Sequence, residues 1–164
     1  MLLRKSQGLR APGLAVILIG DDPASSVYVN SKKRACEQAG LVSKSWHWPS
    51  TATQPELLDL IKQLNEDASI DGILVQLPLP DGLNEAEVLL AIDPDKDVDG
   101  FHPSNVGKLQ QNRPALVPCT PAGVMEMLRR EGIDPKGHVW GIGHSNDIAS
   151  RLEVEGSHSV IVPP

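Results

Sequence analysis

An apolar run at residues 13–20 constrains the fold most, because it holds no charge and begins and ends with glycine. A run this short is typical of a strand buried on both faces of a sheet. Asp22 and Pro23 then indicate the start of a helix, with aspartate as the N-cap and proline at the first helical position. We expect this helix to continue to Ala39 and to stop at Gly40.

The same alternation of strand and helix continues along the chain. Residues 42–48 alternate in polarity and predict a half-exposed strand, and residues 53–56 form a capping box with proline in the first turn. The helix that follows carries one apolar stripe at helical spacing, formed by Leu57, Leu60, Ile61 and Leu64. Residues 73–77 predict a third strand, and residues 85–92 a short helix. Repeated units of this kind predict an α/β fold, a three-layer open parallel sheet with helices on both faces.

A further helix is predicted beyond the polar stretch at residues 110–114, which is the best candidate for a domain boundary. Thr120 and Pro121 are expected to cap this helix, and Gly132 to lie just beyond its end. Val124, Met127 and Leu128 are expected on one of its faces. In parallel sheets ligands bind at the carboxyl ends of the strands, so chemistry is expected just after each strand.

Composition excludes several classes of protein. The 164 residues include 15 Lys and Arg against 21 Asp and Glu, a net charge of −6, which argues against binding to nucleic acid or anionic membranes. No apolar run reaches the length of a membrane span. Cys36 and Cys119 lie far apart without metal-ligand spacing, so we expect free thiols in a reducing compartment, with a single disulfide as the alternative. A soluble cytoplasmic protein is the expectation.

Tyr28, Lys32 and Gln76 are candidate site residues with two interpretations each. Tyr28 and Lys32 are four residues apart and share a helix face. They form either a solvated surface pair or, if Lys32 points into a cleft that lowers its pKa, a group for proton transfer. Gln76 lies near the end of an apolar strand, where an amide must be hydrogen-bonded. It either makes a structural bond to the next loop or faces a ligand.

Two loops resemble ligand-binding motifs only in part. Asp95, Asp97, Asp99 and Gly100 match the first half of a calcium loop, but its twelfth position is Val106 rather than glutamate. The alternative is an acidic loop at a sheet edge, from which Asp99 recognises a polar heterocycle. Residues 141–145 resemble a phosphate-binding turn that lacks its third glycine. No zinc spacing or nucleophilic triad stands out, so no metal site is expected.

Three long motifs, residues 23–36, 71–80 and 94–103, resemble those of the bifunctional methylenetetrahydrofolate dehydrogenase/methenyltetrahydrofolate cyclohydrolase family. The resemblance runs in order over residues 11–137. It implies a folate-binding catalytic domain at residues 1–118, followed at 119–164 by a connecting helix and the start of an NADP-binding domain.

The resemblance also implies roles for individual residues. Tyr28 would stack on the aminobenzoyl ring of the folate, and Lys32 would be the main acid/base group. Gln76 would hold Lys32 in position and lower its pKa, and Asp99 would bind the pterin edge. The same pocket would be lined by Val75 and Leu77.

The implied reactions are the NADP-dependent oxidation of 5,10-methylenetetrahydrofolate to 5,10-methenyltetrahydrofolate and its hydrolysis to 10-formyltetrahydrofolate. These reactions belong to one-carbon metabolism and supply purine biosynthesis. Tetrahydrofolate derivatives are the implied ligands, and a homodimer is the implied assembly. NADP would be bound by Gly143, His144 and Ser145.

The sequence departs from the family toward its end. The family has a complete Rossmann-type domain whose opening motif reads G-R-S-x-x-V-G-x-P, whereas residues 143–151 lack the arginine, the later glycine and the proline. We therefore expect an incomplete, truncated Rossmann-like segment and an impaired hydride transfer. The alternative is a catalytically silent folate-binding or dimerising fragment.

Overall fold

The computed structural model describes the chain except for residues 1–3, 5, 135, 137–138, 143–157 and 162–164. The chain divides into two compact units, Met1–Asp97 and Val98–Pro164. This division by packing lies earlier than the boundary predicted between residues 118 and 119. The boundary between residues 118 and 119 is implied by the family resemblance and stays a prediction.

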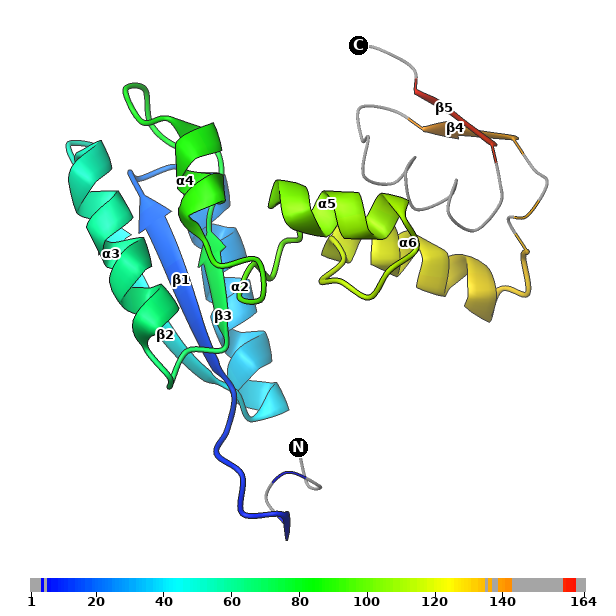
Figure 1. Cartoon of the computed structure of the whole chain (residues 1–164), viewed down its shortest axis with the longest axis horizontal. Coiled ribbons are helices and arrows are strands. Elements are labelled where there is room, and N and C mark those ends of the chain that lie inside the picture. Colours follow the sequence, from blue (N-terminus) through cyan, green and yellow to red (C-terminus); the bar gives the residue numbers. More distant parts are fainter. Residues whose placement is uncertain (1–3, 5, 135, 137–138, 143–157, 162–164) are drawn as a thin grey trace. The chain divides into compact units, whose positions relative to one another are not determined.

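The first unit contains a parallel sheet of three strands in the order β2-β1-β3 (Figure 1). Its strands are β1 (Gly13–Ile19), β2 (Val42–Trp48) and β3 (Gly72–Val75). Six of the seven β1 residues are buried, whereas every residue of β2 is either exposed or half-buried. The central, doubly covered strand and the half-exposed strand are therefore confirmed.

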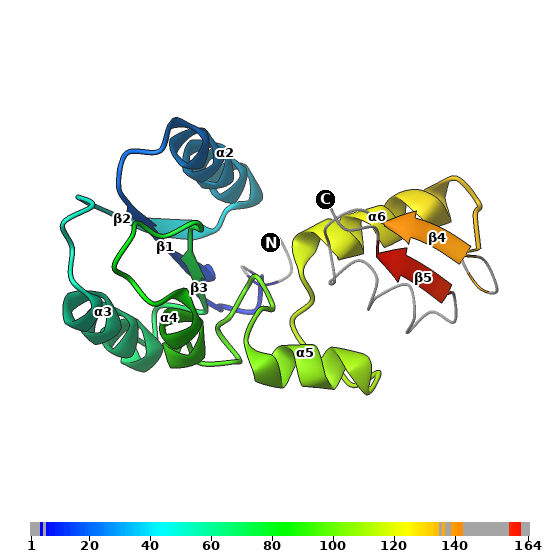
Figure 2. The same ribbon diagram turned by 90° about the horizontal axis from the view of Figure 1, so that it is seen from above.

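Helices cover both faces of this sheet. Figure 2 shows α2 (Pro23–Ala39) on one side and α3 (Gln54–Glu66) with α4 (Glu85–Ala91) on the other. The three predicted layers are confirmed. The core between the sheet and α3 and α4 is aliphatic, and its most deeply buried members include Ala15, Ile17, Leu57, Ile61, Ile73 and Val88.

The predicted helix ends agree closely with the structure. The Asp22 side chain accepts a hydrogen bond from the Ser25 N–H at 3.4 Å, and Gly40 ends α2 in the left-handed region with φ of 75°. At the start of α3, the Thr53 N–H donates to Glu56 Oε2 at 2.9 Å, as a capping box requires. The predicted apolar stripe of α3 is buried in full.

Ion pairs and hydrogen bonds close the amino edge of the sheet, where β1 and β3 begin. Arg10 binds both carboxylate oxygens of Asp71, at 2.6 and 2.9 Å, and also the Ala68 carbonyl. Asp71 Oδ2 accepts a further bond from the Gly13 N–H at 2.7 Å. The hydrogen bond from Arg10 is the main cause of the lowered pKa of Asp71. This network joins the first residues of two neighbouring strands.

At the same edge, the side chain of Lys96 caps the C-terminal end of α3. Its ammonium group donates to the carbonyls of Leu64, Asn65 and Asp67 at 3.0, 2.7 and 3.0 Å, which are groups that the end of a helix leaves unpaired. The Ile73 N–H donates to the Lys96 carbonyl at 2.7 Å, so the loop containing Lys96 runs beside β3. This lysine of the acidic loop is therefore a structural residue.

The second unit contains α5 (Pro103–Gln110), α6 (Cys119–Arg130) and the parallel pair β4 (Val139–Ile142) and β5 (His158–Ile161). The sequence prediction missed α5. Its N-cap is His102, whose Nδ1 accepts from the Ser104 N–H at 3.1 Å, a capping residue outside the usual set.

The prediction for α6 was partly wrong. The helix begins at Cys119, and its N-cap is Pro118, two residues before the predicted cap at Thr120. Met125, 2% exposed, is its deeply buried apolar residue, whereas Met127 is 60% exposed. Both Cys36 and Cys119 are free thiols. Among the described residues, no helix combines the length and apolar character needed to cross a bilayer.

Candidate functional site

The carboxyl edge of the sheet, where β1 and β3 end, carries most of the predicted site residues of the first unit. β1 ends at Ile19, and Gly20 turns the chain toward α2 with φ of 84°. β3 ends at Val75, two residues before the predicted end at Leu77. The Gln76 N–H still donates to the Ile17 carbonyl at 2.9 Å. Gln76 is therefore attached to the central strand although it lies just outside β3.

The two polar ends of the Gln76 side chain differ. Its Nε2 donates to the Leu77 carbonyl at 2.8 Å, which orients the amide. Its Oε1 is buried and has no hydrogen-bond partner in the described part of the chain. An unpaired buried acceptor is costly unless a donor reaches it. One end of this amide makes a structural bond, and the other is available to a ligand or a neighbouring donor.

Tyr28 and Lys32 share a face of α2, as their spacing predicted. Lys32 Nζ lies 5.6 Å from the centre of the Tyr28 ring, within the range of a cation–π contact. Tyr28 is 64% exposed, so a flat ligand can still reach this residue. Lys32 is half-buried. The structure thus brings the aromatic and cationic candidates together, and their role toward a substrate stays a prediction.

The remaining candidates have different surroundings. The Val75 side chain is 4% exposed and packs in the core, so any contact it makes with a ligand falls to its backbone. Leu77 is half-buried. Asp97 pairs with Ile73 in an isolated bridge at the edge of β3, and Asp99 follows in the second compact unit. Asp99 stays a predicted member of the site.

Two loops resembled ligand-binding motifs in part, the acidic loop with Asp95, Asp97 and Asp99 and the phosphate-binding turn at residues 141–145. Within the described residues, no three His, Cys, Asp or Glu side chains gather in a way that could hold a metal ion, and this includes the acidic loop. The predicted cofactor residues Gly143, His144 and Ser145 lie outside the described residues.

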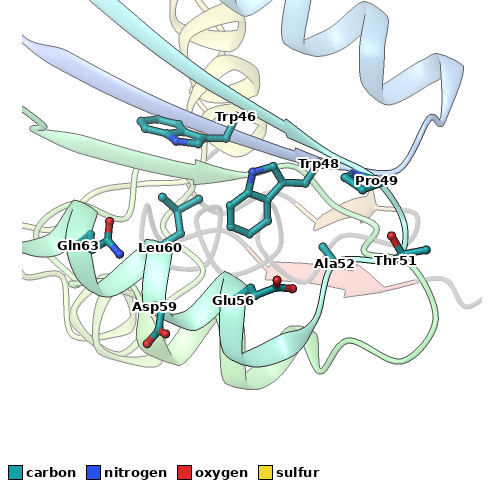
Figure 3. A pocket seen from close by; sticks show the side chains of 9 residues that line it. All are labelled: Trp46, Trp48, Pro49, Thr51, Ala52, Glu56, Asp59, Leu60 and Gln63. Atoms are coloured by element: carbon teal, nitrogen blue, oxygen red, sulfur yellow. The ribbon is translucent and has the colours of Figure 1, made fainter.

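A pocket of about 650 Å³ opens between β2 and α3, and none of the sequence motifs predicts it (Figure 3). Its lining includes Trp46 and Trp48 from the strand and Glu56, Asp59 and Gln63 from the helix. None of the predicted site residues lines it. The signal that could have indicated it is the pair of tryptophans two apart on a strand, next to a helix with carboxylates three apart.

A family comparison accounts for the three long sequence motifs. Residues 2–99 match the model of the tetrahydrofolate dehydrogenase/cyclohydrolase catalytic domain, which is more than half of the chain. The chain belongs to this family. The match covers the β1–α2 segment with Tyr28 and Lys32, the β3 segment with Gln76, and the acidic loop through Asp99.

Solved structures support the assignment to the dehydrogenase/cyclohydrolase family. A bifunctional FolD enzyme, methylenetetrahydrofolate dehydrogenase/cyclohydrolase from Campylobacter jejuni, is 46% identical with a TM-score of 0.92, and the alignment covers 99% of this chain and 59% of that one. A 5,10-methylenetetrahydrofolate dehydrogenase from the silkworm Bombyx mori is 41% identical with a TM-score of 0.93, covering 99% and 61%.

The Trypanosoma brucei dehydrogenase-cyclohydrolase, solved with NADP cofactor and an inhibitor, is 34% identical with a TM-score of 0.92, covering 99% and 57%. The chain thus spans between 57% and 61% of the length of these three relatives. The predicted family resemblance and the predicted fold are both confirmed.

Proposed function

We propose that this chain acts on folate one-carbon units, oxidising 5,10-methylenetetrahydrofolate with NADP and hydrolysing the methenyl product to 10-formyltetrahydrofolate. Support comes from the family match over residues 2–99 and from relatives whose names state these activities. Within this proposal the carboxyl edge of the first unit supplies the folate-binding groups. Homodimer formation, a cytoplasmic location and a supply of purine biosynthesis belong to the same proposal.

The unpaired oxygen of Gln76 carries the assignment of the site. A buried Oε1 whose amide is fixed by Leu77 is a preorganised acceptor that awaits an N–H donor. Either the Lys32 amine or an N–H group of the folate supplies that donor. A purely structural glutamine would have both ends of its amide satisfied.

Lys32 is proposed as the acid/base group and Tyr28 as the stacking platform. In the hydrolysis, water adds to the methenyl carbon, and the amine of Lys32 takes up the proton that this water releases. The Tyr28 ring, 64% exposed and 5.6 Å from Lys32 Nζ, offers an aromatic surface beside that amine. Asp99 is proposed to bind the pterin edge through charge-assisted hydrogen bonds. Val75 and Leu77 are proposed to line the pocket.

NADP is proposed to bind through Gly143, His144 and Ser145. β4 is a parallel strand that ends at Ile142, directly before Gly143, and a turn after a parallel strand is where phosphate groups bind. When bound, NADP accepts a hydride. Because residues 143–151 lack three features of the family motif, we expect weak NADP binding. Titration with NADP measures it, and micromolar affinity would contradict this expectation.

The hydrolysis of methenyltetrahydrofolate, followed by its absorbance, tests the folate site without the redox cofactor. Lys32→Ala is expected to lower the rate by at least about 100-fold, the lower range for losing a general acid or base. Lys33→Ala, an exposed lysine on the same helix, is the matched control and should retain the rate. Unchanged hydrolysis in Lys32→Ala would contradict the proposed site. Folate binding without hydrolysis in the unaltered chain would favour a silent fragment.

A further inference from the structure

The pocket between β2 and α3 is a groove with two unlike walls, which we name the tryptophan groove (Figure 3). Trp46 and Trp48 are two residues apart on β2, so their indoles lie on the same face of the strand and point toward α3. Glu56, Leu60 and Gln63 form the opposite wall from the helix, and Asp59 belongs to the lining although its carboxylate points away from the indoles (Figure 3). Both indoles pack against the buried core, which holds them in place.

The charge of the tryptophan groove favours a cation. Its lining contains two carboxylates, Glu56 and Asp59, and no lysine or arginine. Hydrogen bonds from Thr53 lower the pKa of Glu56, so this side chain keeps its negative charge. A cation between carboxylates and the face of an indole gains from both. Ammonium and guanidinium groups are therefore the chemistry that fits this groove.

The free edge of β2 runs along the same groove. Within the described part of the chain, β2 pairs with β1 and lies at the edge of the sheet. The Val42 N–H donates to the Pro12 carbonyl, and the Trp48 carbonyl accepts from the Gly20 N–H, both at 2.9 Å. The backbone N–H and C=O groups of successive residues point to opposite sides of a strand. The N–H and C=O groups of residues 43, 45 and 47 therefore face outward.

We propose that the tryptophan groove binds an extended peptide segment that carries a lysine or arginine. The backbone of this segment pairs with residues 43, 45 and 47 of β2, as in the addition of a strand to a sheet edge. Its basic side chain enters beside the two indoles next to Glu56, and the nearby negative charge of Asp59 attracts it as well. The volume of about 650 Å³ accommodates such a side chain with its neighbours. The inference does not depend on the proposed folate chemistry.

Tryptophan emission during titration with an acetylated and amidated pentapeptide, one arginine flanked by valines, tests the proposal. Two of the three tryptophans of the chain line the groove, so binding should change the emission. Replacing the arginine by neutral citrulline should weaken binding at least about tenfold, since a cation–π contact and a charge-assisted bond are both lost. Methylating alternate backbone nitrogens of the peptide should weaken it comparably, since strand pairing is lost.

Matched variants locate the site. Glu56→Gln with Asp59→Asn removes both charges, and glutamine at position 56 still suits a capping box, so the helix start is kept. This double variant should lose at least about tenfold in affinity. Glu66→Gln, an exposed carboxylate of α3 outside the lining, should bind like the unaltered chain. Circular dichroism checks that each variant is folded.

Three results would overturn the proposal. The first is the absence of binding at millimolar peptide, and the second is equal binding to the folded double variant. The third is equal affinity for N-acetylarginine amide and the pentapeptide, which would reveal a site for a small cation without strand pairing.

Discussion

The two edges of the sheet in the first unit differ in how far their polar groups are paired within the protein. At the amino edge, Arg10 binds Asp71, Asp71 also accepts from Gly13, and Lys96 binds three carbonyls. At the carboxyl edge, Gln76 keeps a buried oxygen without a partner among the described residues, and on α2, the helix that follows this edge, Tyr28 is largely exposed. Apart from Ser43 Oγ near the start of β2, which is buried without a partner among the described residues, the amino edge is satisfied internally, whereas the carboxyl edge has groups available for a ligand.

This difference follows from what each edge has to do. Paired charges and capped helix ends at the amino edge hold the strands in register, and they stabilise the folded state without a ligand. Groups at the carboxyl edge that await a ligand contribute little to folding until it arrives. Amino-edge substitutions should therefore reduce stability, whereas carboxyl-edge substitutions should reduce function. Four measurements can break or sharpen this contrast.

Gly13→Ala should have the largest effect on stability. A Cβ at this position would overlap the backbone carbonyl oxygen of Ser69, and a backbone atom cannot move aside as a flexible side chain can. We expect the free energy of unfolding to fall by about 3 kcal/mol, as for an overpacked core. Urea denaturation measures it. Gly123→Ala in α6, where an added Cβ meets no atom within 4 Å, is the control and should not destabilise.

Lys96→Met should have the next largest effect. Methionine keeps most of the side-chain volume but leaves the three carbonyls at the end of α3 without their ammonium donor. A loss of about 2 kcal/mol is expected from hydrogen bonds made by a charged group. Lys62→Met, an exposed lysine on α3, should change stability little. Equal effects of the two substitutions would show that Lys96 does not hold this edge.

Lys32→Met should leave stability almost unchanged, by contrast with Lys96→Met. Its described contact is the partly exposed cation–π pair with Tyr28, worth about 0.5–1 kcal/mol. The urea midpoint should therefore move only slightly while the hydrolysis of methenyltetrahydrofolate is lost. A fall in stability as large as that of Lys96→Met would remove the proposed distinction between the two edges.

The smallest change in stability is expected when the pH is lowered and Asp67 becomes protonated. Hydrogen bonds from the side chain and backbone of Ser69, followed by the nearby Lys44, lower the pKa of Asp67 from 3.8 to about 2. Because the folded-state pKa is depressed, the stabilisation is complete above about pH 4 and is lost as the pH falls toward 2. Thermal unfolding between pH 5 and pH 2 measures this loss.

A variant with Asp67→Asn should lose less stability over that range, whereas Asp81→Asn, an exposed aspartate, should follow the unaltered chain. If the Asp67 variant followed the unaltered chain as well, this carboxylate would not contribute to the amino edge.

Much of the first unit was predictable because its signals are local. The Asp22 cap, the stop at Gly40, the capping box of α3 and the buried stripe of that helix each depend on residues within a few positions of one another. The shared face of Tyr28 and Lys32 is likewise a consequence of helical spacing. The family motifs identified the same residues as site candidates.

Other features were missed where the signal was not local or not typical. α5 uses His102 as its cap, and α6 begins at Cys119 after a proline, so the usual capping residues were absent or misplaced. The tryptophan groove needs β2 and α3 side by side, which no spacing within either segment reveals.

The sequence by itself determined that this is a layered parallel α/β protein of the dehydrogenase/cyclohydrolase family. Hydrophobic periodicity, helix caps and long motifs can each be recognised from residues that are close together in the sequence. Only the tertiary structure decided which polar groups are paired. Lys96 and Lys32 both occur in the family-like motifs, yet one binds three backbone carbonyls and the other lies beside an exposed ring. The reason is physical: whether a charge stabilises the fold or remains available for chemistry depends on which distant groups the packing brings within hydrogen-bond distance.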